Sequence, residues 1–213
     1  HKFQGFNIQK RVIRNYPIKS AANILGYINE VNELIAKKDN YYQQGELIGK
    51  AGVEAQYEKV LRGKKGKKHF RRDRFNKIMG PFKNGIYDSI AVNGKDITLT
   101  IDSKLQQYGE YLMNGKRGGI IALEPSSGEI LALVTSPSYD PNMMVGRLRS
   151  PNSVKLIGDT INKPMYDRGL KGTYPPGSPF KLVNALIGLQ EEVIDENSHF
   201  FCNGGYRYGN RKN

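Results

Sequence analysis

Cysteine, long apolar runs and acidic side chains are all scarce in this chain of 213 residues. Cys202 is the only cysteine, so an internal disulfide is excluded within this sequence. No stretch reaches the roughly 18 apolar residues that a membrane-spanning helix needs, and no secretory signal is recognisable. Because the chain starts at His1 and its last stretch is rich in Gly, Tyr and Arg, we expect an internal piece of a longer protein.

The shortage of acidic residues leaves a basic surplus. The chain has 33 Lys and Arg against 20 Asp and Glu, a formal net charge of +13 that favours an anionic partner. Nine basic residues and one acid fall within residues 62–77, RGKKGKKHFRRDRFNK. We interpret this run as a solvated domain edge, with attraction to anionic lipid head groups as a weaker functional alternative. Nucleic-acid binding is not favoured, because Phe70 and Phe75 are the only aromatic residues in the run and no nucleic-acid motif accompanies it.

The composition shifts near residue 95, where we place a boundary between a domain of residues 1–94 and one of residues 95–213. The first part is polar, basic and irregular. Within it, residues 53–63 predict a short helix because their apolar side chains share one face. Residues 22–31 fit either a strand or a helix.

Regular elements are indicated more clearly after residue 95. Alternating apolar residues predict a strand over 96–102. A helix is predicted over 103–113, with a capping box formed by Ser103 and Gln106.

A hairpin and a second helix follow. The apolar runs 119–125 and 129–137 predict the hairpin, because the turn-forming SSG stands between them. Residues 137–177 are predicted to form a loop rich in Pro, Asn and Asp. Apolar residues at helical spacing predict a buried helix over 179–190.

The stretch GTYPPGSPFKL, residues 172–182, stiffens the backbone before Ser178 and places Lys181 three residues later. A serine hydroxyl stays protonated at neutral pH and needs an adjacent base to act as a nucleophile. Pro179 suits the first helical position, so Ser178 and Lys181 are expected one turn apart on the same face. A lysine kept neutral by apolar surroundings accepts the serine proton. Ser-x-x-Lys also occurs by chance, and the alternative is that Ser178 is simply a helix cap.

Resemblance to a known family extends beyond Ser-x-x-Lys, which is itself a signature of penicillin-binding proteins and β-lactamases. Residues 121–142 and 162–181 are similar to the first transpeptidase hairpin of class B penicillin-binding proteins and to the approach to their nucleophile. YPPGS resembles the elongation-type members. Residues 45–66, with 11–17 and 24–31, resemble the pedestal, or dimerisation, domain of the same proteins.

The resemblance implies an α+β pedestal (dimerisation) domain followed by the N-terminal part of an α/β penicillin-binding/β-lactamase-like transpeptidase domain. It implies a peptidoglycan D,D-transpeptidase of cell elongation and shape, in which Ser178 attacks the D-Ala-D-Ala end of a stem peptide. Lys181 is the implied base, and the Ser178 backbone N–H is one implied oxyanion donor. β-Lactams are implied to acylate the same serine. Neither a cofactor nor a metal is expected.

The resemblance also implies a single membrane anchor upstream of residue 1 and an ectodomain on the periplasmic side of the cytoplasmic membrane. A membrane glycan polymerase of the shape, elongation and division family is the implied protein partner, and nucleic acid is not expected as one. The two further motifs of the family, Ser-x-Asn and Lys-Thr/Ser-Gly, do not follow Lys181. We therefore expect this fragment alone to be inactive.

Three other functions stay open. A β-lactamase also uses Ser-x-x-Lys, but it hydrolyses its acyl-enzyme quickly and does not need a pedestal of 94 residues. A non-enzymatic cell-wall scaffold or β-lactam sensor acylates once and does not turn over. An anion-binding module driven by the basic run is the most distant alternative.

Other polar residues have ordinary explanations. Cys202 is expected to be structural, although the resemblance leaves open a downstream metal or disulfide partner. His69 and His199 have no partner at ligand spacing and are expected at the surface.

Three loop aspartates flank the nucleophile segment: Asp140, Asp159 and Asp167. Loop aspartates usually stabilise turns. The alternative for Asp167 is that it orders, together with Arg168, the approach to YPPG.

Overall fold

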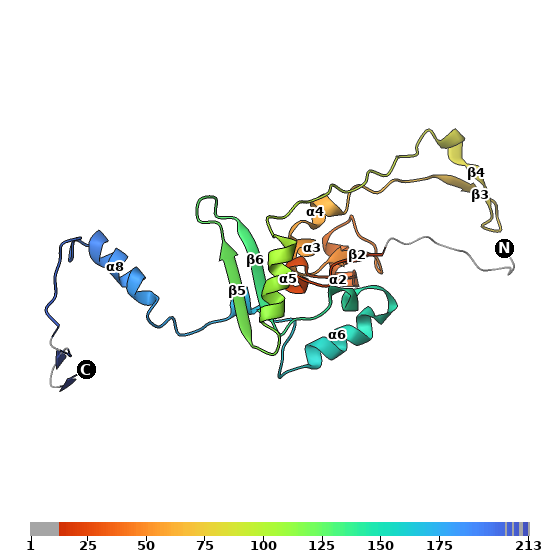
Figure 1. The fold of residues 1–213 in the computed structure, drawn as a ribbon. Coiled ribbons are helices and arrows are strands. Elements are labelled where there is room, and N and C mark those ends of the chain that lie inside the picture. The colour runs from red at the N-terminus through yellow and green to blue at the C-terminus, as the bar shows by residue number, and fades with distance from the viewer. Residues whose placement is uncertain (1–12, 203, 206, 209–210, 213) are drawn as a thin grey trace. The chain divides into compact units, whose positions relative to one another are not determined.

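A computed structural model describes residues 13–202, 204–205, 207–208 and 211–212, and residues 11–12 of the stretch 11–17 lie outside them. The chain divides into two compact units, His1–Gly172 and Thr173–Asn213 (Figure 1). Among the helices of the described ranges, none combines the length and the hydropathy that crossing a bilayer demands.

The elements are as follows. The α-helices of the first unit are α1 (Ala22–Leu25), α2 (Glu33–Lys38), α3 (Gly52–Gln56), α4 (Glu58–Leu61), α5 (Ser103–Leu112), α6 (Arg149–Gly158) and α7 (Arg168–Lys171). Its 3₁₀ helices are η1 (Phe82–Gly85), η2 (Pro141–Met144) and η3 (Gly146–Leu148). Its strands are β1 (Ile28–Glu30), β2 (Leu47–Gly49), β3 (Phe70–Arg72), β4 (Ile78–Pro81), β5 (Gly118–Leu123) and β6 (Ile130–Ser136). The second unit holds α8 (Phe180–Gln190), β7 (Arg207–Tyr208) and β8 (Arg211–Lys212).

The N-terminal part is built from short elements around the antiparallel pair of β1 and β2. Residues 22–31 contain both of the structures that their sequence allows, since α1 is followed by β1. The single helix predicted over 53–63 is instead two, α3 and α4. They separate at Tyr57, whose φ of −106° and ψ of 18° depart from helical values.

Residues 64–92 form two antiparallel chain segments, named here the basic arm. Backbone bridges join Lys64 to Val92 and Lys67 to Ser89, and β3 pairs with β4 farther along. Figure 1 shows the two segments running side by side to the turn between these strands. The arm therefore contains residues 64–77 of the basic run.

The predicted hairpin is confirmed as β5 and β6, which pair antiparallel from Gly118↔Ser136 to Leu123↔Ile130. Helix α5 packs on β6, and this contact forms the core, where Val134 is completely buried. Gly109 of α5 is needed there, because a Cβ at this position would lie 2.7 Å from a methyl group of Val134. The two apolar runs and the SSG turn between them thus form the hairpin that the sequence predicts.

The strand predicted over 96–102 is wrong. Only two hydrogen bonds link this segment to β6, from Thr100 Oγ1 to the Ile130 carbonyl at 2.7 Å and from the Asp102 N–H to the Leu131 carbonyl at 2.9 Å. A strand needs a repeated backbone ladder. The next backbone groups of β6 are instead bound by the side chain of Gln106, which stops the pairing.

The capping box predicted for α5 is also wrong. Asp102 is the N-cap, and its carboxylate accepts hydrogen bonds from the N–H groups of Lys104 and Leu105 at 2.8 and 2.9 Å. These bonds hold the pKa of Asp102 below its usual range. Gln106 is free of any capping role because it faces the core, where it is 1% exposed.

The loop predicted over 137–177 contains α6 and α7 together with η2 and η3. Short polar residues begin two of these elements, since Asp140 caps η2 and Asp167 caps α7. The missed helix α6 has few apolar side chains facing inward, and Leu156 is its one buried residue. The many Pro, Asn and Asp residues in this segment, Pro151 among them, make it resemble a loop in the sequence.

Helix α8 confirms the helix predicted over 179–190, apart from its first residue. Its expected burial is not observed. Leu182, Leu186 and the other apolar side chains of α8 are exposed, and Leu182 is 72% exposed. The described residues therefore do not supply the surface that such an apolar helix normally packs against.

Candidate active site

Ser178 lies in the turn that leads into α8. The N-cap position is occupied by Pro179, which already has helical dihedrals of −54° and −26°. No side-chain capping bond is made there, so Ser178 is not the helix cap that the simpler alternative supposed. Ser178 is exposed.

Lys181 lies one turn beyond Ser178, as the spacing predicts. Its backbone N–H donates to the Ser178 carbonyl at 3.0 Å, and the Phe180 N–H donates to the Gly177 carbonyl at 3.1 Å. These bonds give the first turn a tight, 3₁₀-like geometry. Among the described residues no hydrogen bond joins the two side chains, and both are exposed. The fold thus places Ser178 and Lys181 at the same end of α8, but their side chains are not hydrogen-bonded to each other.

Gly177 sets the direction in which the chain enters this turn. Its φ of +58° belongs to the left-handed region, which costs about 1–2 kcal/mol for residues with a Cβ. A Cβ at this position would meet nothing within 4 Å, so the requirement comes from the backbone alone. None of the backbone hydrogen bonds among the described residues uses the Ser178 N–H, the predicted oxyanion donor.

The residues that approach this segment are tied to the hairpin in the first unit. Asp167 accepts a hydrogen bond from Thr135 Oγ1 of β6 at 2.8 Å and another from the Leu170 N–H at 3.1 Å. Gly119 and Gly169 allow a close approach of α7 to β5, since a Cβ on Gly119 would lie 3.1 Å from the Gly169 Cα. Asp167 therefore joins α7 to β6, beyond the local turn that loop aspartates usually make.

Arg168 is buried beside Asp167, with 6% of its surface exposed. Its guanidinium donates to three backbone carbonyls of the preceding turn, those of Asn162, Lys163 and Tyr166. A guanidinium carries five donors, so one side chain can organise this whole turn. Residues 162–171 are consequently fixed as one piece, which ends at Gly172.

Asp140 and Asp159 have the expected turn-stabilising role, and the Asp140 carboxylate also lies 3.6 Å from the Lys19 amine. Asp140 caps η2 by accepting from the Asn142 N–H at 2.8 Å. Hydrogen bonds from the backbone and side chain of Asn162 hold the pKa of Asp159 below its usual range. Both carboxylates stabilise turns.

Gln106 and Thr135 are structural residues whose roles the sequence does not reveal. The Gln106 side chain accepts from the Leu133 N–H at 2.8 Å and donates to the Leu133 carbonyl at 3.1 Å, as a neighbouring strand would. Their partners lie 27 and 32 positions away along the chain. Local patterns carry no signal for such contacts.

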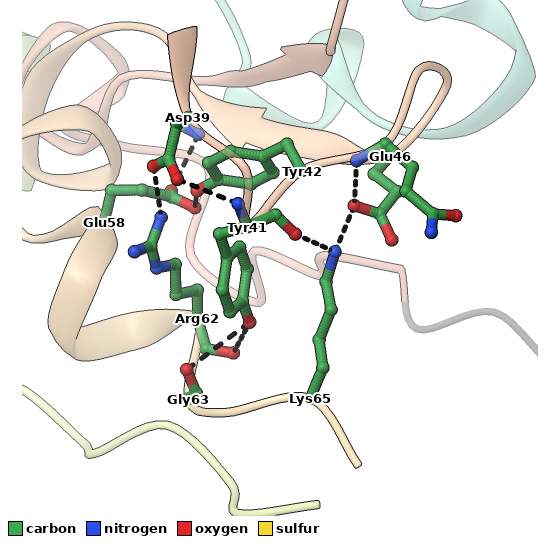
Figure 2. Close-up of polar contacts among 10 residues, drawn as sticks. Asp39, Tyr41, Tyr42, Glu46, Glu58, Arg62, Gly63 and Lys65 are labelled. Carbon is green, nitrogen blue, oxygen red and sulfur yellow. Dashed lines mark hydrogen bonds and ion pairs between the residues drawn. The ribbon is translucent and has the colours of Figure 1, made fainter. Parts of the chain in front are cut away.

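A cleft in the first unit is lined by a cluster of charged and aromatic residues (Figure 2). Arg62 donates to Asp39 at 3.1 Å and lies 3.9 Å from the centroid of the Tyr41 ring. The Tyr42 hydroxyl donates to Glu58, and Lys65 pairs with Glu46. The ion pairs Arg62–Asp39 and Lys65–Glu46 join this part of the chain to the base of the basic arm.

The remaining candidates are separate from one another. Cys202 is exposed and unbonded, His69 lies 3.5 Å from an Asp88 oxygen, and His199 is exposed. Within the described ranges, no three His, Cys, Asp or Glu residues gather in a way that could hold a metal ion.

Comparison with known proteins assigns each half of the chain to a domain family. Residues 1–99 match the penicillin-binding protein dimerisation domain, and residues 118–212 match the penicillin-binding protein transpeptidase domain. The chain is 36% identical to peptidoglycan D,D-transpeptidase MrdA of Acinetobacter baumannii over 198 residues, 92% of this chain and 29% of that protein. It is 33% identical to MrdA of Escherichia coli K12 over 214 residues, 97% of this chain and 33% of that protein. The chain thus spans about a third of the length of these curated relatives.

Solved structures give the same relationship. The structure is similar to PBP2 of Helicobacter pylori in its complex with MreC, with a TM-score of 0.79 and 29% identity over 94% of this chain and 37% of that one. It is also similar to Pseudomonas aeruginosa PBP2 in complex with WCK 5153, with a TM-score of 0.70 and 35% identity over 97% of this chain and 41% of that one.

Proposed function

Because the chain belongs to the penicillin-binding proteins, with their dimerisation domain followed by the first part of their transpeptidase domain, we propose that it is part of a peptidoglycan D,D-transpeptidase acting in cell elongation. Ser178 is the proposed nucleophile and Lys181 its base. The observation that carries this assignment is the turn at the start of α8, where the Lys181 N–H donates to the Ser178 carbonyl at 3.0 Å. Serine and lysine are thereby held one turn apart.

The proposed first step forms an ester on Ser178. Its Oγ attacks the carbonyl carbon between the two D-alanines of a stem peptide, and the Lys181 amine takes the hydroxyl proton. The carbonyl oxygen becomes an oxyanion, toward which the Ser178 N–H donates. The C–N bond then breaks as Lys181 gives the proton to the leaving nitrogen, the terminal D-alanine departs with a free amino group, and the acyl group stays on Oγ.

The second step transfers the acyl group to an amine of a neighbouring stem peptide. That amine attacks the ester carbonyl, the C–O bond to Ser178 breaks, and the serine recovers its proton through Lys181. A β-lactam reacts in the first step only, because its opened ring stays attached to the acyl group and blocks the acceptor.

For Lys181 to accept a proton, it must spend part of its time neutral, which burial favours. Both side chains of the pair are exposed in the described chain, as is the apolar surface of α8 behind them. We propose that further chain of the complete enzyme covers this surface and supplies the Ser-x-Asn and Lys-Thr/Ser-Gly motifs. On this proposal residues 1–213 alone are inactive.

We propose the boundary between pedestal and transpeptidase domains at residues 94 and 95, which lies within the first compact unit of contacts. We propose further that the whole protein is anchored in the cytoplasmic membrane upstream of residue 1, with its ectodomain on the periplasmic side. Its proposed substrates are stem peptides that end in D-Ala-D-Ala, and β-lactams are its covalent inhibitors.

Two similar structures support a protein partner. One is the complex of PBP2 with MreC from Helicobacter pylori, and the other is a peptidoglycan synthase complex that coordinates polymerisation and crosslinking. The second similarity, with a TM-score of 0.77 and 26% identity, covers all of this chain and 39% of that one. We propose a membrane glycan polymerase of the shape, elongation and division family as the partner.

The test is release of D-alanine by the full-length protein from a pentapeptide stem that ends in D-Ala-D-Ala. We expect catalytic turnover for the wild type and none for Ser178→Ala. Stoichiometric release that stops after one equivalent favours a sensor or scaffold. Rapid hydrolysis of a penicillin by the same protein favours a β-lactamase.

A further inference from the structure

We propose that the basic arm, residues 64–92, binds the surface of an anionic lipid bilayer and inserts its tip into the head-group region. The inference rests on the arm alone and is independent of the reaction at Ser178. Three features carry it: unpaired cations, exposed apolar side chains among them, and their distribution over both faces of the hairpin.

Apart from Lys65, which pairs with Glu46, the Lys and Arg side chains of the arm form no ion pair among the described residues. Lys67, Lys68, Arg71, Arg74 and Lys77 are exposed, and none of them takes part in an ion pair among the described residues. Basic side chains on strand edges can serve merely to prevent pairing with other chains. That role does not account for the apolar residues that accompany them.

The acid nearest to these cations is occupied by the backbone. Oδ1 of Asp73 accepts hydrogen bonds from the Phe75 and Lys77 N–H groups at 2.8 and 2.9 Å, which closes the turn at the tip. Arg74 points its guanidinium toward the Phe75 ring, 4.7 Å from the centroid. The turn thus holds an aromatic ring and a cation together at its end.

Large apolar side chains of the arm are exposed although most such residues are normally buried. Phe75 is 75% exposed, Met79 60% and Ile78 52%. Farther along, Phe70, Ile86 and Tyr87 are also exposed. An exposed apolar group rimmed by charge marks an interaction surface.

The arrangement favours a bilayer over a folded protein as the occupant. Alternation along β3 puts Phe70 on one face and Arg71 on the other, and both are exposed. A globular partner covers one face of a hairpin. A lipid interface surrounds its tip, accepts aromatic and aliphatic side chains at the head-group level, and attracts cations on every side.

The absence of tryptophan from the chain allows a direct test. The test uses the whole chain carrying Phe75→Trp and vesicles of phosphatidylcholine with phosphatidylglycerol. When the vesicles are added, we expect the tryptophan fluorescence to shift to shorter wavelength and to be quenched by brominated lipid. Pure phosphatidylcholine should give neither effect, and added salt should weaken both. Leu34→Trp on α2 and Leu186→Trp on α8, which are exposed apolar sites outside the arm, are matched controls that should stay unchanged.

A second set of variants tests the cations. Each basic side chain near an anionic surface strengthens binding by about fivefold, so Lys67→Gln with Arg71→Gln should weaken vesicle binding by about 25-fold. Lys37→Gln with Lys38→Gln removes the same charge from α2 and should change binding by less than twofold. Ser178→Ala should bind vesicles like the wild type.

Equal binding of wild type and arm variants overturns the proposal, as does a blue shift at Leu186→Trp in place of Phe75→Trp. Failure of the wild type to bind anionic vesicles at all also overturns it, and a protein then becomes the occupant of this surface. None of these results bears on acylation of Ser178.

Discussion

Thr135 Oγ1 donates a hydrogen bond of 2.8 Å to Asp167 Oδ1, and both side chains are buried. The bond joins the β5–β6 hairpin to α7, the last helix before Ser178. The same carboxylate caps α7 through the Leu170 N–H, so one side chain fixes two elements. This contact anchors the segment that leads to the turn before Ser178.

Asp167→Ala should lower the free energy of unfolding by about 1–3 kcal/mol, because it removes a helix cap and leaves the buried Thr135 hydroxyl without its acceptor. Thr135→Val should cost less, about 1 kcal/mol. Urea denaturation of both variants and of the double mutant measures the coupling. We expect the double mutant to be less destabilised than the sum of the two, and simple additivity would show that the bond contributes nothing.

Gln106→Leu should destabilise the first unit by about 2–4 kcal/mol, since it leaves both the N–H and the carbonyl of Leu133 buried without partners. Gln107→Leu changes the next residue of α5, whose side chain is exposed, and is the matched control. Its free energy of unfolding should lie within about 0.5 kcal/mol of the wild-type value. If chemical denaturation gives equal destabilisation for Gln106→Leu and Gln107→Leu, the hydrogen bonds of Gln106 to the Leu133 backbone do not stabilise the fold.

Gly177→Ala should slow acylation of the full-length protein by a penicillin, by about five- to thirtyfold, because the turn before Ser178 needs a positive φ. Gly172→Ala is the control, since the φ of −69° there suits any residue. The second-order rate constant of acylation is the quantity to measure. Similar rate constants for the two variants would show that the positive φ of Gly177 is not needed to position Ser178.

Three tyrosines should ionise late. Burial raises the pKa of Tyr16, Tyr42 and Tyr139 to about 12, against about 10 in an unfolded chain. Between these values the folded chain keeps protons that the unfolded chain has lost, so stability should fall as the pH rises from 10 to 12.

Absorbance at 295 nm during an alkaline titration follows these groups directly. In the folded chain, Tyr16, Tyr42 and Tyr139 should titrate near pH 12, and in urea this late step should disappear. Tyr139→Phe should reduce the absorbance change near pH 12 by the contribution of one tyrosine. A single transition in the folded chain would contradict the burial of these hydroxyls.

The sequence predicts elements whose cause is local. The hairpin follows from two apolar runs on either side of a turn, and α8 follows from Pro179 and the apolar spacing behind it. The one-turn separation of Ser178 and Lys181 needs nothing beyond that helix. Such features depend on neighbours a few residues away, which a sequence displays.

Features that depend on distant partners could not be predicted. Residues 96–102 alternate like a strand, but Gln106 binds the Leu133 backbone that such a strand would use. The buried position of Arg168 depends on three carbonyls in a turn whose shape the sequence does not give. The burial expected for α8 depends on contacts that the described chain does not contain.

The most direct test of the account is the intact mass of the full-length ectodomain after incubation with a penicillin, with Ser178→Ala and Lys181→Ala alongside. We predict one long-lived adduct on the wild type, none on Ser178→Ala, and strongly slowed formation on Lys181→Ala. A folded wild-type ectodomain without an adduct, or an adduct that persists in Ser178→Ala, would contradict the assignment of Ser178 as the nucleophile.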